Sequence, residues 1–91
     1  MEIKISDEEV GKEFLNVLQN MIKIRISKRK IYKDTYLSDT KDFLLSQIKN
    51  KIKRIEIHLD NNTETNDIEK ALDNALDISV YALFLATNLK H

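Results

Sequence analysis

The segment 69–81 reads E-K-A-L-D-N-A-L-D-I-S-V-Y. Its acids Glu69, Asp73 and Asp77 recur every four residues, so on a helix they form one stripe of carboxylates. Val80 continues the same sector, where the sequence becomes apolar on nearly every side of the helix. Since a purely solvated face would not change from acids to apolar side chains, we expect the acids to face a groove or an interface. Carboxylates at such a place are costly without a cation, so the stripe is either a metal site or half of a salt-bridge network.

The composition of the 91-residue chain favours one small all-α domain. The chain has no proline, and Gly11 is its only glycine. Tight hairpins and many-stranded folds draw on Gly, Pro and Asn-Gly turns, so a β-rich fold is disfavoured. A chain of this length buries a limited fraction of its surface, and we expect a bundle completed by oligomerisation.

Apolar residues at helical spacing place the helices of this bundle. Ser6 and Glu9 have the spacing of a capping box and mark the start of the first helix. The polar segment 60–66, D-N-N-T-E-T-N, is predicted as a turn that joins two antiparallel helices. The three helices are expected over about residues 7–26, 39–59 and 67–89.

Charge and composition exclude several classes of protein. The 15 basic and 15 acidic residues balance, so the chain has no overall field to attract nucleic acid. The absence of cysteine excludes disulfides, thiol nucleophiles and cysteine-based zinc sites. No apolar run reaches membrane-spanning length and no secretory signal is visible, so we expect a cytoplasmic protein that does not contact membranes.

Two further groups of residues bear on the acidic stripe. Lys51 and Arg54 on the second predicted helix could pair with its carboxylates, or could hold the phosphates of a ligand. Glu9 and Glu13 form another pair of acids four residues apart, and together with the stripe they could hold two magnesium ions. Acids in the first turn of a helix are also favoured by its dipole and need no function.

The basic segment 27–40 is predicted as a long connection, with helical structure at its start left open. Basic residues are dense from Lys23 to Lys33, and Tyr32 and Tyr36 lie among or just after them. Basic residues beside aromatic rings can bind a nucleotide, with the ring stacked on the base and the cations on the phosphates. Such residues can equally bind single-stranded nucleic acid or form a solvated loop.

Three segments of the chain resemble the MazG-like, all-α nucleotide pyrophosphohydrolases, most closely their nucleotide-modification-associated branch. The segment 28–36, K-R-K-I-Y-K-D-T-Y, is similar to the lysine-rich "D-Y-G-D-S-W" segment of that branch. The segment 48–55, I-K-N-K-I-K-R-I, is similar to its "D-K-x-x-R-I" helix. The segment 69–82, E-K-A-L-D-N-A-L-D-I-S-V-Y-A, is similar to "E-x-x-x-D-x-x-x-D-x-x-x-Y-A".

The resemblance implies a helical dimer or tetramer that hydrolyses a nucleoside triphosphate to the monophosphate and pyrophosphate. It implies that Glu69 and Asp73 ligate magnesium with support from Asp77, and that Lys51 and Arg54 contact phosphates. In the first segment, it makes Lys30, Tyr32 and Asp34 candidates for nucleotide binding. The sequence departs from the family at Lys33, where the family has glycine, and at Asn50, where it has an acid. It also lacks the E-x-x-E pair that usually precedes the acidic helix.

The sequence therefore supports three hypotheses. The leading one is a magnesium-dependent MazG-like pyrophosphohydrolase or nucleotide-binding protein, acting as a homo-oligomer. The alternative is a non-enzymatic interaction module whose acids form salt bridges at a subunit interface. Nucleic-acid binding through the segment 23–33 is a weaker third option, because the net charge is zero.

Overall fold

The computed structural model describes residues 5–60 and 65–90, and this part of the chain is helical without strands. The all-α prediction is therefore confirmed. In chain order the elements are α1 (Asp7–Val10), α2 (Lys12–Tyr32), the short 3-10 helix η1 (Thr35–Ser38), α3 (Lys41–Asp60) and α4 (Thr65–Lys90). Residues 61–64 of the predicted turn lie outside the described part.

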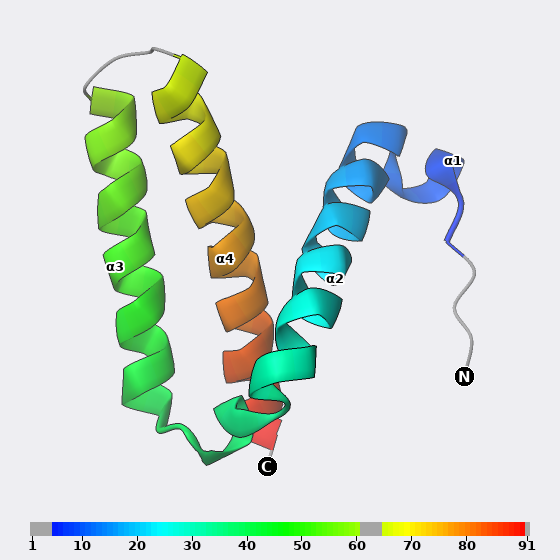
Figure 1. Ribbon diagram of the computed structural model, residues 1–91. Coiled ribbons are helices and arrows are strands. Elements are labelled where there is room, and N and C mark those ends of the chain that lie inside the picture. The colour runs from blue at the N-terminus through cyan, green and yellow to red at the C-terminus, as the bar shows by residue number, and fades with distance from the viewer. Residues whose placement is uncertain (1–4, 61–64, 91) are drawn as a thin grey trace.

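The helices α3 and α4 form an antiparallel hairpin, as expected from the sequence (Figure 1). The hydroxyl of Thr40 accepts a hydrogen bond from the backbone N–H of Phe43 and caps the start of α3. Next to this cap, Leu44 is fully buried. At the other end of the hairpin, Nδ1 of His58 lies 3.2 Å from the carboxylate of Asp67 and joins α3 to α4.

The first predicted helix is divided and longer than expected. Ser6 caps α1 as predicted: its hydroxyl accepts from the backbone N–H of Glu9 and also hydrogen-bonds to the Glu9 carboxylate. Gly11, at φ 85°, then separates α1 from α2. The helix α2 continues to Tyr32 and does not end near Ile26, so most of the predicted connection is helix and a 3-10 turn.

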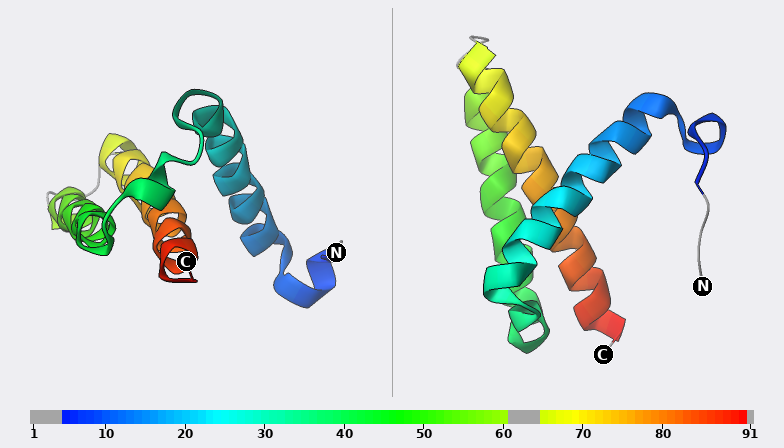
Figure 2. Two further views of the ribbon diagram at one scale, coloured as in Figure 1. Left: turned by 90° about the horizontal axis from the view of Figure 1, so that it is seen from below. Right: turned by 45° about the vertical axis from the view of Figure 1, so that its right-hand side comes forward.

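The helix α2 diverges from the hairpin. Seen from two directions, α4 lies between α3 and α2, and α2 crosses α4 at an angle with its N-terminal end free (Figure 2). Met21 and Val80 are buried where the two helices meet. The C-terminal end of α4 is tied down by the buried Asn88, whose amide donates to the backbone carbonyls of Tyr36 and Asp39 at 3.3 and 2.9 Å.

The single chain has a larger accessible surface and a larger radius of gyration than a compact monomer of the same length. Its accessible surface is 7311 Å², whereas a compact monomer of this length exposes about 5,500 Å². Its radius of gyration is 14.9 Å, compared with about 12 Å for a compact domain. Within the described residues, no helix combines the length and the apolar composition needed to cross a bilayer.

Candidate nucleotide pocket

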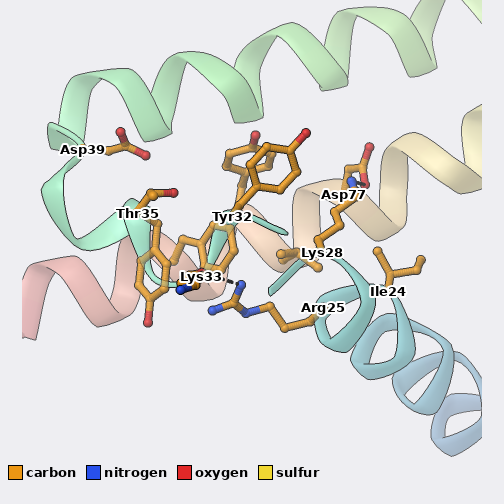
Figure 3. Close-up of a pocket in the computed structure, with 12 residues that line it drawn as sticks. Ile24, Arg25, Lys28, Tyr32, Lys33, Thr35, Asp39 and Asp77 are labelled. Carbon is orange, nitrogen blue, oxygen red and sulfur yellow. Dashed lines mark hydrogen bonds and ion pairs between the residues drawn. The ribbon is translucent and has the colours of Figure 1, made fainter. Parts of the chain in front are cut away.

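A hollow lies where α2, η1 and α4 meet (Figure 3). Its volume is about 410 Å³, within the range of small-molecule sites. All three tyrosines of the chain, Tyr32, Tyr36 and Tyr81, line it. The remaining lining side chains are mainly basic or apolar, with two acids: Ile24, Arg25, Lys28, Lys33, Thr35, Asp39, Asp77, Val80 and Phe84.

Stacked aromatic rings form one wall of the pocket. The rings of Tyr36 and Phe84 are nearly parallel with centroids 4.3 Å apart, and Tyr81 meets Phe84 edge-on at 5.7 Å. The guanidinium of Arg25 lies 4.9 Å from the Phe84 centroid and 5.4 Å from that of Tyr36. This arrangement fixes η1 against α4 and provides the pocket with flat, partly polar surfaces.

An arginine pair holds the turn after α2. Asp34 accepts hydrogen bonds from Arg25 at 2.9 Å and from Arg29 at 3.1 and 3.0 Å. The hydrogen bond from Arg29 holds the pKa of the Asp34 carboxyl below its ordinary value, and the two guanidinium charges act in the same direction. The same hydrogen bond raises the pKa of Arg29. Asp34 therefore fixes the position of the two arginines, and both of its carboxylate oxygens are hydrogen-bonded to them.

The backbone turns sharply at Lys33. This residue has φ 53° and ψ −131°, and it is the only non-glycine residue of the described segments with positive φ. Its N–H donates to the carbonyl of Arg29 at 2.9 Å, and its own carbonyl accepts from Arg25 at 3.2 Å. These bonds end α2 and direct the chain into η1 below the pocket.

Asp77 is the acid of the predicted stripe that reaches the pocket, and it is paired with two lysines. Its carboxylate lies 3.3 Å from Nζ of Lys51 on α3 and 3.7 Å from Nζ of Lys28 on α2. In Figure 3 the Lys28 side chain extends to Asp77 across the gap between the helices. The Lys51 side chain is 13% exposed, and its ammonium also lies 5.6 Å from the Tyr81 ring. Asp77 thus links three helices electrostatically.

The structure brings together some of the sequence-predicted site residues and separates others. Tyr32 and Asp77 line the pocket, and Lys51 contacts Asp77 just behind it. The remaining candidates for binding and for metal ligation lie away from the pocket lining, with exposed side chains except for the half-buried Asp34: Lys30, Asp34, Arg54, Glu69, Asp73, Glu9 and Glu13. Glu9 and Glu13 lie at the free N-terminal end of the α1–α2 arm, and in the described segments no three acids or histidines are close enough to hold a metal ion.

Sequence reasoning missed the central position of Arg25 and the role of Phe84. The signal for Arg25 was present, because Arg25, Lys28 and Arg29 share one face when the segment after Ile26 is helical. Phe84 falls in the same helical sector as Glu69, Asp73 and Asp77, a sector expected to face a groove or an interface, but the stacking of its ring on Tyr36 was not predicted.

Compared with known proteins, the chain matches no protein-family model, no curated protein and no solved structure. The likeness to MazG-like pyrophosphohydrolases therefore rests on the three quoted segments.

Proposed function

We propose that this protein binds a nucleotide in the pocket between α2, η1 and α4. The observation that carries the proposal is that one cavity of about 410 Å³ is lined by all three tyrosines and by several cations of the chain. The tyrosines offer flat surfaces for a base, and lysines bind phosphate as point charges. The cavity volume suits a ligand of nucleotide size.

The positions of the family-like segments support the same proposal. Segment 28–36 contributes Lys28, Tyr32 and Tyr36 to the lining, and segment 69–82 contributes Asp77 and Tyr81. Segment 48–55 reaches the site through its lysine at position 51, which holds Asp77. Stretches that are distant in the sequence therefore meet at one cavity, as expected for segments that share a ligand.

The resemblance also implies magnesium-dependent hydrolysis, which the residues of a single chain support less well than they support nucleotide binding. Asp77 already has lysine partners on both sides, and Glu69 and Asp73 are exposed and lie outside the pocket lining. A magnesium site needs several oxygen ligands around one point, and no group of three acids or histidines meets this need in the described part of the chain. The acids of one chain do not fit the ion, so the proposal is limited to nucleotide binding.

A second candidate function, self-association, is favoured by the exposed apolar surface. The arm α2 presents Phe14, Val17 and Leu18 beside Leu83 of α4, around an open apolar hollow of about 360 Å³. Phe14 is 64% exposed. The whole chain exposes about 1,800 Å² more than a compact monomer, whereas a standard interface buries about 800 Å² on each partner. We propose that a second copy covers this face, since two neutral chains do not repel each other.

Isothermal titration with non-hydrolysable nucleoside triphosphates of the four common bases tests the binding proposal. Wild type should bind at least one of them, and Tyr32→Ala combined with Lys28→Ala should weaken that binding. The matched control is Lys53→Ala, which removes an exposed charge on α3 away from the pocket. Folded wild type that binds none of the four nucleotides would contradict the proposal and leave self-association as the better candidate.

The same titration should be repeated with and without magnesium. Asp73→Asn should leave nucleotide affinity unchanged if the acids of α4 do not hold a metal ion. A magnesium-dependent increase in affinity that this variant abolishes would show that a metal–phosphate site does form, and turnover should then be measured.

A further inference from the structure

Lys33 occupies a backbone conformation that suits glycine. At φ 53° and ψ −131° it lies outside the left-handed helical region that other residues occasionally adopt. A Cβ atom makes this region costly, and glycine enters it without that penalty. Strain of this kind persists only where the surrounding structure imposes it, and it is concentrated at functional sites.

Neighbouring hydrogen bonds impose the conformation at Lys33. Its N–H is held by the carbonyl of Arg29, and its carbonyl is held by the guanidinium of Arg25. Both arginines are in turn fixed by Asp34. None of these bonds uses the Lys33 side chain, so a glycine would make the same turn at lower cost. The turn therefore does not explain why a lysine is present.

Lys33 adds a positive charge to the pocket lining that no described carboxylate pairs with. Lys33 lines the cavity together with Lys28 and Arg25. Arg25 is paired with Asp34, and Lys28 lies near Asp77. No carboxylate of residues 5–60 and 65–90 forms a salt bridge with Lys33. Of these three cations, Lys33 is the one that forms no salt bridge with a described residue, while Lys28 shares Asp77 with Lys51. The charge of Lys33 is therefore the least engaged of the three.

We propose that Lys33 is the phosphate-binding cation of this pocket, and that its charge is the reason for a lysine at a position that suits glycine. The inference rests on the proposed nucleotide function and adds to it the residue that holds the phosphate. Replacing Lys33 with glycine should therefore raise the stability of the fold and lower the affinity for phosphate.

The test compares Lys33→Gly with wild type in two measurements at one protein concentration. Thermal unfolding should shift upward by a few degrees, because glycine relieves the strain. Titration with the best-binding non-hydrolysable nucleoside triphosphate should show an affinity loss of roughly 10- to 100-fold, the usual effect of losing a hydrogen bond to a charged group. The affinity for the corresponding nucleoside, which has no phosphate, should be the same in Lys33→Gly and in wild type.

Two controls separate local from general effects. Lys33→Arg keeps both the charge and the strain, so it should retain most of the triphosphate affinity without the gain in unfolding temperature. Lys53→Ala removes a charge elsewhere and should change neither measurement substantially.

The outcomes distinguish this inference from the function on which it rests. If wild type binds the triphosphate and Lys33→Gly binds it equally well, the role of Lys33 is wrong and the nucleotide pocket stands. If Lys33→Gly loses affinity for the nucleoside as much as for the triphosphate, its effect is not on phosphate and the inference is also wrong. If wild type binds no nucleotide and no inorganic tripolyphosphate, the proposed function fails together with the inference.

Discussion

At the scale of single residues, Asp77 is the acid of the predicted stripe for which the described residues provide salt bridges. The sequence left open a metal site or a salt-bridge network, and the carboxylate of Asp77 lies within salt-bridge distance of Lys51 and Lys28. Lys51 is largely buried, so its ammonium depends on this partner more than an exposed lysine would. The ion pair thereby ties α3 and α2 to α4.

A double-mutant cycle measures this link. Asp77→Asn should lower the free energy of unfolding by about 1–2 kcal/mol, because it leaves the Lys51 charge without its partner. Combining Lys51→Met with the same Asp77→Asn substitution should recover much of that loss, since no isolated charge remains. Urea unfolding of the four proteins gives the coupling energy. Additive effects with no coupling would show that the pair does not contribute to stability.

Because of Asp34, we expect the stability of the fold to depend on pH in the acid range. The pKa of the Asp34 carboxyl is lowered in the folded protein, mainly by the hydrogen bond from Arg29. Its stabilising contribution is therefore complete above the pKa of the unfolded carboxyl, at about 4, and is lost as the pH falls through the lower folded value. Asp34→Asn should lower the unfolding temperature at pH 7, and this difference from wild type should shrink below about pH 4. An equal difference at both pH values would contradict the assignment.

At the scale of the elements, the sequence predicted α3 and α4 well because each has a continuous apolar stripe. Residues such as Leu44 and Val80 recur at helical spacing and are buried. The C-terminal part of α2 falls in the segment predicted as a connection whose helical start was left open, and there is a physical reason for this. After Ile26 come Ser27 and three basic residues, followed by Ile31 and Tyr32, and all six side chains are exposed, so the apolar period stops although the helix continues.

The pocket could be predicted only in part for the same reason. The aromatic and basic residues of segment 28–36 were visible as a possible binding segment. Their placement against Phe84 depends on the turn at Lys33 and on the hydrogen bonds of Asn88, which join residues about 50 positions apart. Such contacts depend on tertiary packing and have no local signature in a single sequence.

Hydrogen exchange tests the unequal packing of the helices. The N-terminal half of α2 contacts the rest of the chain through one face only, whereas α3 and α4 pack along their length. In dilute protein, the amides of residues 12–22 should therefore exchange faster than those of residues 71–85. Their exchange should slow at higher protein concentration if a second copy covers the arm. Equal protection of both segments in the most dilute sample would show that α2 is packed more firmly than this arrangement implies.

At the scale of the whole molecule, the open shape is the main argument for assembly. A single chain with this surface and radius leaves much apolar area in water, and small domains of this size commonly gain stability by association. The apolar surface formed by Phe14 of α2 and Leu83 of α4 is the face that we propose a second copy covers.

Sedimentation velocity tests this assembly with one charge substitution. Wild type should sediment as a dimer or larger species, and Phe14→Asp should shift it toward monomer because a buried carboxylate opposes the contact. The matched control is Ile57→Asp on the outer part of α3, which is also an exposed apolar residue and should leave the assembly unchanged. Wild type that remains monomeric at high micromolar concentration would contradict self-association.

An NMR titration of the labelled protein can locate the bound ligand. Adding a non-hydrolysable nucleoside triphosphate should shift the backbone amide signals of residues 24–39 and 77–84, which surround the pocket. The signals of Glu9, Glu13 and the outer face of α3 should remain in place. We expect saturable shifts confined to residues 24–39 and 77–84. Saturable shifts centred elsewhere, or none at millimolar nucleotide, would contradict this expectation.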